Sequence, residues 1–463
     1  MSLLIILAAL AFLMYVAYRG HSVILFAPVA ALGAVLLTNP GLVAPMFTGL
    51  FMDKMSGFLK LYFPVFLLGA VFGKLVEIAG FSHAIVASVV RFAGPRHAIL
   101  AIVTVCGLLT YGGVSLFVVV FAVYPFAVEL FRQMNLPKRL IPATIALGAF
   151  SFTMDALPGT PQIQNIIPGS FFKTTIYAAP WLGSLGGLFI ITAGVLYLNW
   201  RCHRAADEGY GSHQLQEPEP VKGGPMAHPF IALLPLLLVG VMNKVFTLAI
   251  PKAYGDNHSF IPAVVGQAAP VTQEVAKVAA IWAVEGALLC GIATVLLFAW
   301  KIVAARFAEA SKPAISGALL ACMNTASEYG FGAVIAALPG FLVVSNALKA
   351  IPHALVNEAV AVTSLAGITG SASGGLSIAL AAMSDTFIQN AQAAHIPMEV
   401  LHRIAAMASG GMDTLPHNGA VITLLTVTGL THRQAYKDVF AITCIKTAAV
   451  FVVITVYQFT GLV

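Results

Sequence analysis

The sequence predicts an all-α polytopic membrane protein built from two inverted-topology repeats. Two observations carry this prediction. Of the 463 residues, 59% are hydrophobic and only 9% are charged, whereas a soluble domain has about 25% charged residues. A Met-Asp-x-Leu-Pro motif at 154–158 occurs again at 412–416, each time inside an apolar stretch. We therefore expect membrane-spanning helices, with one interrupted helix in each half.

Ten apolar segments are long enough to cross a bilayer, which takes about 17–25 helical residues. They run near 2–18, 22–38, 60–80, 140–171, 176–199, 229–250, 275–300, 313–346, 397–430 and 437–462. Two of them, 140–171 and 397–430, contain Pro, Gly and polar residues at mid-length and are predicted to be broken helices. Shorter segments of mixed character at 50–59, 81–95 and 347–359 are expected to be interfacial connectors.

Two further apolar segments, 97–133 and 360–394, are predicted to be re-entrant hairpins. Each has a Gly-rich polar cluster at mid-length, 110–115 in the first and 369–377 in the second. Cytoplasmic loops are enriched in Lys and Arg, and the basic clusters of this chain fall on one side if 97–133 enters and leaves from the cytoplasm. This topology places both termini outside, in the periplasm of a bacterium.

The two halves are predicted repeats, joined by a polar cytoplasmic linker at 201–228. The tetrapeptide 112–115 matches 374–377, in the same order relative to the two Asp motifs. Five crossings per half, an odd number, invert the second repeat relative to the first. The first repeat is expected at 1–200, with scaffold 1–80, connector 81–96, hairpin and broken helix 97–171 and last helix 176–199. The second repeat is expected at 229–463, with scaffold 229–346, hairpin and broken helix 360–430 and last helix 437–462.

Candidate substrate-binding residues gather at the hairpin tips and helix breaks. Irregular backbone at membrane depth is buried in protein or lines a watery cavity. Helix N-termini suit a carboxylate, so we expect anion binding without a buried Lys or Arg. Hydroxyl and amide groups can hold a hydroxylated substrate. The expected substrate-binding residues are Tyr111, Gly112, Gly113, Ser115, Thr160, Asn165, Ser371, Ser373, Gly374, Gly375, Ser377, His417 and Asn418.

Asp155 and Asp413 are the expected sites of cation or proton coupling. A carboxylate at membrane depth costs several kcal/mol unless a proton, a cation or a partner neutralises it. The alternative is that each Asp caps the half-helix that follows it. Four more acidic residues lie in apolar surroundings: Glu129, Glu285, Glu328 and Asp385.

Two stretches resemble the gluconate permease (GntP) family of the ion transporter superfamily. The first is Tyr-Gly-Gly-Val-Ser-Leu-Phe at 111–117, followed by Tyr-Pro-Phe at 124–126. The second is Asp-Ala-Leu-Pro-Gly-Thr-Pro-Gln-Ile-Gln-Asn at 155–165. The likeness covers nearly the whole chain and is strongest for the branch of hydroxybutyrate and other hydroxy-acid permeases. It implies a homodimer in the bacterial inner membrane, whose hairpin domains move like an elevator against a fixed scaffold.

The expected function is proton-coupled uptake of a small organic carboxylate, such as hydroxybutyrate or a gluconate-like acid. Moving an anion against an inside-negative potential costs about 2.3 kcal/mol per charge per 100 mV, so uptake needs a co-transported cation. H+ is expected, Na+ is the alternative, and no enzymatic activity, cofactor, metal or nucleic-acid partner is expected. A carrier of citrate or another di- or tricarboxylate, an intramembrane aspartyl protease and a passive channel are the other hypotheses. Two matched hairpins favour a carrier.

Overall fold

The first half of the chain is a series of helices. The structure is a computed structural model, and it describes residues 2–19, 21–93, 97–114, 116–211, 227–261, 270–349, 351–369, 371–416 and 418–463. In chain order the main helices are α1 (Ser2–Tyr18), α2 (Val23–Thr38), α4 (Met52–Ile78), α5 (Phe81–Ala93), α6 (Ala98–Tyr111), α7 (Leu116–Gln133), α8 (Ile141–Ala149), α9 (Phe152–Asp155), α10 (Ile163–Phe172) and α11 (Pro180–Arg204). Short helical turns η1, α3 and η2 lead from Pro40 to Phe51.

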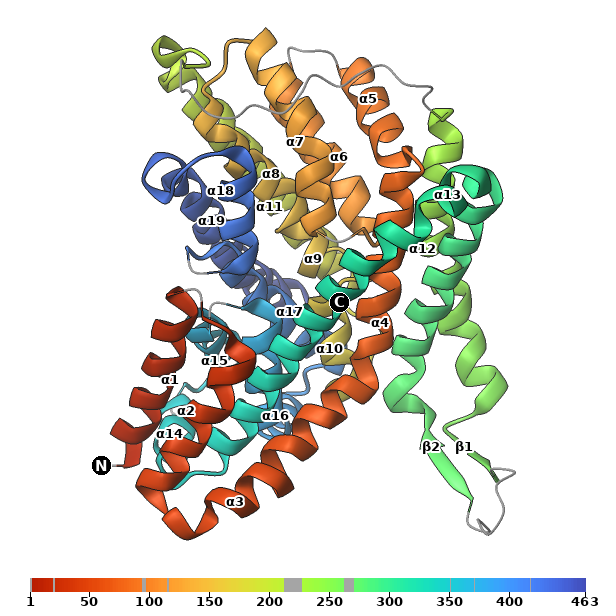
Figure 1. Cartoon of the computed structure of the whole chain (residues 1–463). Coiled ribbons are helices and arrows are strands. Elements are labelled where there is room, and N and C mark those ends of the chain that lie inside the picture. The colour runs from red at the N-terminus through yellow and green to blue at the C-terminus, as the bar shows by residue number, and fades with distance from the viewer. Residues whose placement is uncertain are drawn as a thin grey trace.

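The second half follows a similar order of elements and adds a small β-hairpin (Figure 1). Its elements are α12 (Pro229–Tyr254), β1 (Asn257–Phe260), β2 (Val271–Glu274), α13 (Val275–Ala336), α14 (Pro339–Lys349), α15 (Ala354–Thr369), α16 (Ala372–Ala393), α17 (Met398–Gly410), η6 (Gly411–Thr414), α18 (Gly419–Thr428) and α19 (His432–Thr460). The antiparallel strands β1 and β2, which were not predicted, project from the helical body.

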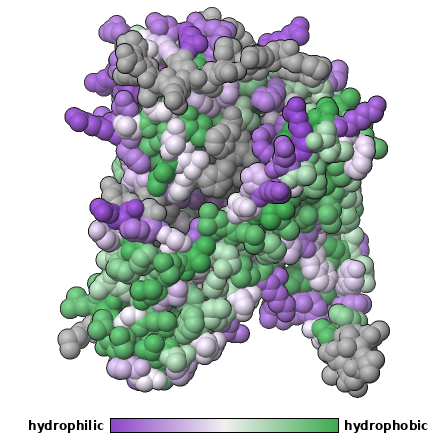
Figure 2. Space-filling model, in the orientation of Figure 1, coloured by the Kyte–Doolittle hydropathy of each residue, from purple (hydrophilic) through white to green (hydrophobic). Residues whose placement is uncertain are grey.

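The prediction of an all-α polytopic membrane protein is confirmed. Within the described residues, five helices are long and apolar enough to cross a bilayer: Pro40–Ile78, Pro180–Arg204, Pro229–Tyr254, Lys277–Ala336 and His432–Thr460. Large apolar side chains such as Leu297, Leu37 and Leu4 are exposed. Figure 2 shows hydrophobic residues over the surface of α1, α2 and the second part of α13. This surface suits lipid, which solvates apolar side chains.

A long inclined pair, α4 and α13, corrects several predicted boundaries (Figure 1). The predicted segments 275–300 and 313–346 correspond to two parts of α13, because the backbone at Ala299 is not helical and the helix changes direction there. The second part begins before residue 313 and ends at Ala336 instead of residue 346. The predicted connector 50–59 lies mostly in α4. Its polar residues Asp53 and Lys54 line a cavity instead of ending the helix.

The other two predicted connectors are also largely helical. Segment 81–95 is α5 up to Ala93, and 347–359 contains the end of α14 and the start of α15. The structure therefore shortens the connections between helices, as is usual in compact helical proteins. Of the predicted linker 201–228, α11 extends to Arg204, and 212–226 lies outside the described residues.

Both segments predicted to be hairpins are helix–turn–helix units. Helices α6 and α7 are joined by a turn in which Gly113 has φ +93°, a conformation that favours glycine. Helices α15 and α16 pack so closely that a Cβ on Gly375 would collide with the backbone of Ala366. The membrane face on which each hairpin opens stays a prediction.

Replacing Gly375 by Ala is expected to force the arms of the second hairpin apart. The obstacle is backbone, which cannot rotate away as a side chain can, so we expect the overpacking to cost about 1–3 kcal/mol or more. The thermal unfolding midpoint of the protein in detergent measures this loss. Gly33→Ala is the matched control, because a Cβ on Gly33 of α2 meets nothing within 4 Å. Equal midpoints for the two variants would contradict the close packing.

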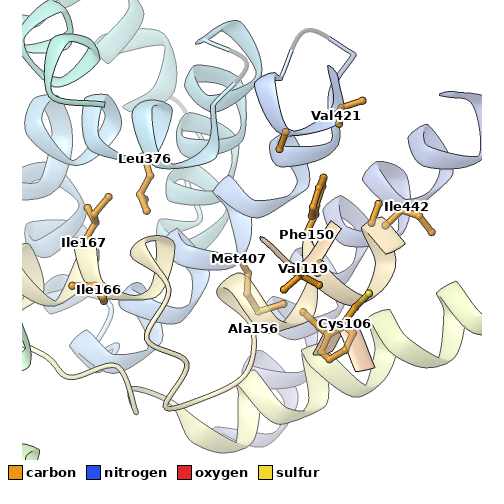
Figure 3. Packing of buried hydrophobic residues seen from close by; sticks show 14 of the residues in the cluster. Cys106, Val119, Phe150, Ala156, Ile166, Ile167, Leu376, Met407, Val421 and Ile442 are labelled. Carbon is orange, nitrogen blue, oxygen red and sulfur yellow. The ribbon is translucent and has the colours of Figure 1, made fainter. Parts of the chain in front are cut away.

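The predicted helix breaks are present in both halves and share one core. The chain leaves helical geometry between α9 and α10 and again between η6 and α18. Figure 3 shows buried residues of the first half, including Phe150 and Ala156, near Met407 and Ile442 of the second half. The interrupted backbone of the first break is thus buried at Ala156, Gly159 and Thr160 and partly buried between them, in keeping with the demand for protein cover at membrane depth.

One end of the helical body has a cluster of ionic contacts around the buried Asp438 of α19. Arg139 and Arg201 contact its carboxylate at 2.8 and 2.6 Å, and Tyr197 donates to it at 2.8 Å. Arg139 also binds Glu208 and thereby lowers the pKa of that carboxyl. Arg139, just before α8, and Arg201, near the end of α11, thus meet at one end of the helical body. Basic residues are enriched on the cytoplasmic side of membrane proteins.

Candidate substrate and cation site

The two helix breaks meet at Asp413. The amide of Gln164, at the start of α10, donates to Asp413 Oδ2 at 2.7 Å. The backbone N–H of Ala372, the first residue of α16, points to Asp413 Oδ1 at 3.4 Å. The partial positive charge at a helix N-terminus favours a carboxylate. Asp413 therefore joins the first break, the second break and the tip of the second hairpin.

Asp155 is neutralised by a lysine of the last helix. Its Oδ2 lies 2.8 Å from Lys446 Nζ, and both side chains are fully buried. Lys446 also donates to the carbonyls of Phe150, at 2.9 Å, and Gly410. A Cβ on Gly410 would collide with the Asp155 carboxyl, so the absence of a side chain at Gly410 leaves room for the ion pair of Asp155 with Lys446. This ion pair connects the first break to α17 and α19.

Arg403 of α17 binds the backbone that the first break frees. Its guanidinium, which is fully buried, donates to the carbonyls of Asp155 at 2.7 Å and Ala178 at 2.8 Å. It also donates to Asn165 Oδ1 at 2.9 Å. Asn165 Nδ2 in turn donates to the carbonyls of Thr160 and Ile176. The network satisfies carbonyls that no helix partner reaches.

The buried Lys446 and Arg403 near Asp155 were not anticipated, and anion binding without a buried Lys or Arg stays a prediction. Lys446 and Arg403 lie beside the predicted carboxylates because two buried negative charges need nearby positive charges. The signal was present in the sequence, since a Lys or Arg inside an apolar helix normally has a buried partner or faces a cavity. Nothing in the sequence indicated which acid each would meet.

The predicted residues of the first repeat form the contact between hairpin tip and break. Tyr111 Oη donates to the carbonyl of Pro158 at 2.8 Å, and a Cβ on Gly112 would collide with Leu236 of α12. Thr160 Oγ1 donates to the carbonyl of Thr153 at 2.5 Å and is buried, as Asn165 is. Both residues hold the break together in this structure. Their contact with substrate, and that of Gly113, stays a prediction, and Ser115 lies outside the described residues.

The predicted residues of the second repeat lie near the tip of the second hairpin or cap helices. Ser371 Oγ accepts from Gly374 N at 3.1 Å at the start of α16. Asn418 Oδ1 accepts from Ala420 N at 2.7 Å at the start of α18. Ser373 Oγ is 3.4 Å from Thr325 Oγ1 on the scaffold helix α13. Ser377 Oγ donates to the carbonyl of Ser373 at 2.7 Å. His417 lies outside the described residues.

A cavity of about 360 Å³ opens between the inclined helices and the broken elements. A volume of this order holds a small-molecule ligand. Tyr62, whose hydroxyl donates to Ser170 Oγ at 3.1 Å, lies on its wall together with Ser377. Lys54 and Lys277 also line it, with Asp53 nearby. The lining offers hydroxyl groups, the charges of Lys54 and Asp53, and Lys277, which forms an ion pair with Glu274 at 2.7 Å. Hydroxyl groups and lysines of this kind can bind a small hydroxylated anion.

Comparison with known proteins supports a transport role. No family model matches the chain. Over 475 residues it is 58% identical to the uncharacterized transporter YxjC of Bacillus subtilis (strain 168), and the match covers 100% of both chains. The chain belongs to the YxjC family of transporters. Its fold also resembles the crystal structure of the YdaH transporter of Alcanivorax borkumensis, which has an unusual topology. The TM-score is 0.51, with 16% identity over 92% of this chain and 90% of that chain.

Membership of the YxjC family supports a transport role and not an enzymatic one. Asp155 and Asp413 are the two acids that an aspartyl protease would need as a pair. In this YxjC-family chain Asp155 pairs with Lys446, and Asp413 accepts from Gln164 and the hairpin tip. The acids anchor two junctions of irregular backbone instead of sharing one proton.

Proposed function

We propose that this transporter is a proton-coupled symporter of the GntP type that takes up a small organic monocarboxylate across the bacterial inner membrane. The meeting of both broken helices and the second hairpin tip at Asp413 carries the proposal. Asp155 is balanced by Lys446, and Asp413 accepts from the neutral amide of Gln164, so this part of the protein offers no further positive charge for a substrate. An added substrate anion then needs an added cation.

The cavity supports a hydroxy acid as the substrate. Lys54 and Lys277 attract the carboxylate, and the hydroxyls of Ser377 and Tyr62 can bond its carboxylate or hydroxyl group. A short acid such as 3-hydroxybutyrate or a gluconate-like acid fits these groups with one negative charge. Citrate or another multivalent acid is the second candidate, because one of its carboxylates could bind Lys54 and a second could compete with Glu274 for Lys277.

The proposed mechanism is an elevator movement in a homodimer. The inclined helices α4 and α13 belong to the scaffold, and the hairpins with the broken helices form the moving unit. Asp413 is the proposed coupling carboxyl, because Asp155 already has Lys446 as its counter-ion. The similar order of elements in the two halves supports inverted repeats, with periplasmic termini and a cytoplasmic linker.

Counterflow in proteoliposomes tests the proposal. Vesicles preloaded with unlabelled 3-hydroxybutyrate, gluconate or citrate should transiently accumulate the same labelled acid, which a carrier does and a channel does not. Ser377→Ala should weaken affinity for the transported acid about 3- to 10-fold, as expected for one lost hydrogen bond. Thr455→Ala is the control, because its hydroxyl bonds only its own helix on an exposed face. Absence of counterflow with a panel of organic acids would refute the proposed function.

A further inference from the structure

Glu328 of the scaffold helix α13 is a buried carboxyl that faces the tip of the second hairpin. Its exposure is 3%, and its Oε2 atom has no hydrogen-bond partner among the residues that the structure describes. This oxygen lies against Gly374, where a Cβ would collide with it. The hydroxyl of Ser371, also at the tip, hydrogen-bonds the carboxyl. The acid is thus closed in by the hairpin that the proposed mechanism moves.

The contact around Glu328 is tight on both sides along the helix. Thr325 Oγ1 is 3.4 Å from Ser373 Oγ, one turn before Glu328. A Cβ on Gly332, one turn after it, would lie 2.6 Å from Ile378. Residues three and four apart share a helix face, so one face of α13 docks on the start of α16 with Glu328 at its centre.

No positive charge balances Glu328 among the described residues. Helices α2 and α10, which pack on α13, contain no charged residue. From α4, the charged residues Asp53 and Lys54 and the titratable Tyr62 line the cavity beside Tyr329. The acid of α16, Asp385, is exposed and eleven residues beyond Gly374. Across the tip, Asp413 is occupied by Gln164 and Ala372 N.

We propose that Glu328 binds a transported proton where α13 docks on the tip of the second hairpin. An ionised carboxylate without a partner is costly in this position, whereas a neutral carboxylic acid is tolerated. When the tip leaves α13, water reaches the carboxyl and the proton is released. Tyr329 and Ser377, next to the contact, line the cavity and give the proton a path. Docking and proton binding are therefore linked, each favouring the other.

This inference rests on the proposed function, because the tip must move during transport. It adds a proton site that is separate from Asp413 and located on the scaffold side of the interface. With this site, one of the protons carried in each transport cycle depends on Glu328. Loss of the site should lower the ratio of protons to substrate by one and leave exchange of substrate intact.

The test compares Glu328→Gln with Glu358→Gln in proteoliposomes, with whichever labelled acid shows counterflow in the wild type. The Glu328→Gln variant keeps the shape and neutrality of the protonated acid, so counterflow should persist. Accumulation at an inside-negative potential of 100 mV should fall about 50-fold, which is 2.3 kcal/mol for one fewer charge. Glu358 is the control, a fully buried acid of α15 whose carboxyl oxygens also have no partner. An unchanged proton ratio in Glu328→Gln would overturn the inference.

An infrared measurement separates this inference from the proposed function, because it needs no substrate. At pH 7 the wild type should show a protonated-carboxyl band that Glu328→Gln lacks. Spectra without this difference would mean that Glu328 is ionised, which overturns the inference even if counterflow succeeds. If no acid gives counterflow but the band is present, the proposed function fails and the proton site stands. A loss of Na+ stimulation in place of a changed proton ratio would also overturn it.

Discussion

Replacing Lys446 by Met is expected to destabilise the transporter by about 3–5 kcal/mol, because it leaves a buried charge without its partner. Lys446 Nζ is 2.8 Å from Asp155 Oδ2, and neither side chain reaches solvent. Met has a similar length, so it removes the charge and its hydrogen bonds while it largely fills the volume. The variant should unfold at a markedly lower temperature in detergent and show no transport.

A second substitution distinguishes lost charge from lost packing. In Lys446→Met combined with Asp155→Asn the unpaired charge is absent, and part of the stability should return. Lys437→Met, on the exposed face of the same helix, should leave the unfolding temperature nearly unchanged. If Lys446→Met and Lys437→Met unfold at the same temperature, the ion pair does not stabilise the junction of α9 with α19.

Arg403→Lys is expected to loosen the first helix break although it keeps the positive charge. The guanidinium bonds the carbonyls of Asp155 and Ala178 and the side chain of Asn165 at the same time. An ammonium group is a single point donor and cannot reproduce this planar arrangement. Since a hydrogen bond to a charged group contributes about 1.5–3 kcal/mol, losing one or two should cost at least that much.

Hydrogen exchange at the break measures this effect directly. Amides of 156–162 and 173–179 should exchange faster in Arg403→Lys, while those of the distant α1 keep their wild-type rates. Arg433→Lys, an exposed arginine of α19, is the control for the same substitution at the surface. Wild-type exchange at both segments would show that other contacts hold the break in place.

Membrane class, helix breaks and hairpin turns could be predicted from the sequence because their causes are local. An apolar run of sufficient length suits a lipid bilayer wherever it occurs. Pro158 and Pro416 interrupt the helical pattern within their own segments, because proline lacks the N–H that a helix needs. Gly113, which has a positive φ, also follows from its single position in a turn. These features do not depend on which distant segment packs against them.

Partners of the buried charges were decided only by the tertiary structure. Arg403 meets the Asp155 carbonyl across 248 residues of sequence, and Gln164 meets Asp413 across 249. The sequence indicates that Asp155 and Asp413 are at membrane depth but not which residues they contact, because electrostatic energy depends on distances that the packing of whole helices sets. The same packing turned the predicted connector 50–59 into helix and placed Glu328 against Gly374, since both depend on how α4, α13 and α16 lie together.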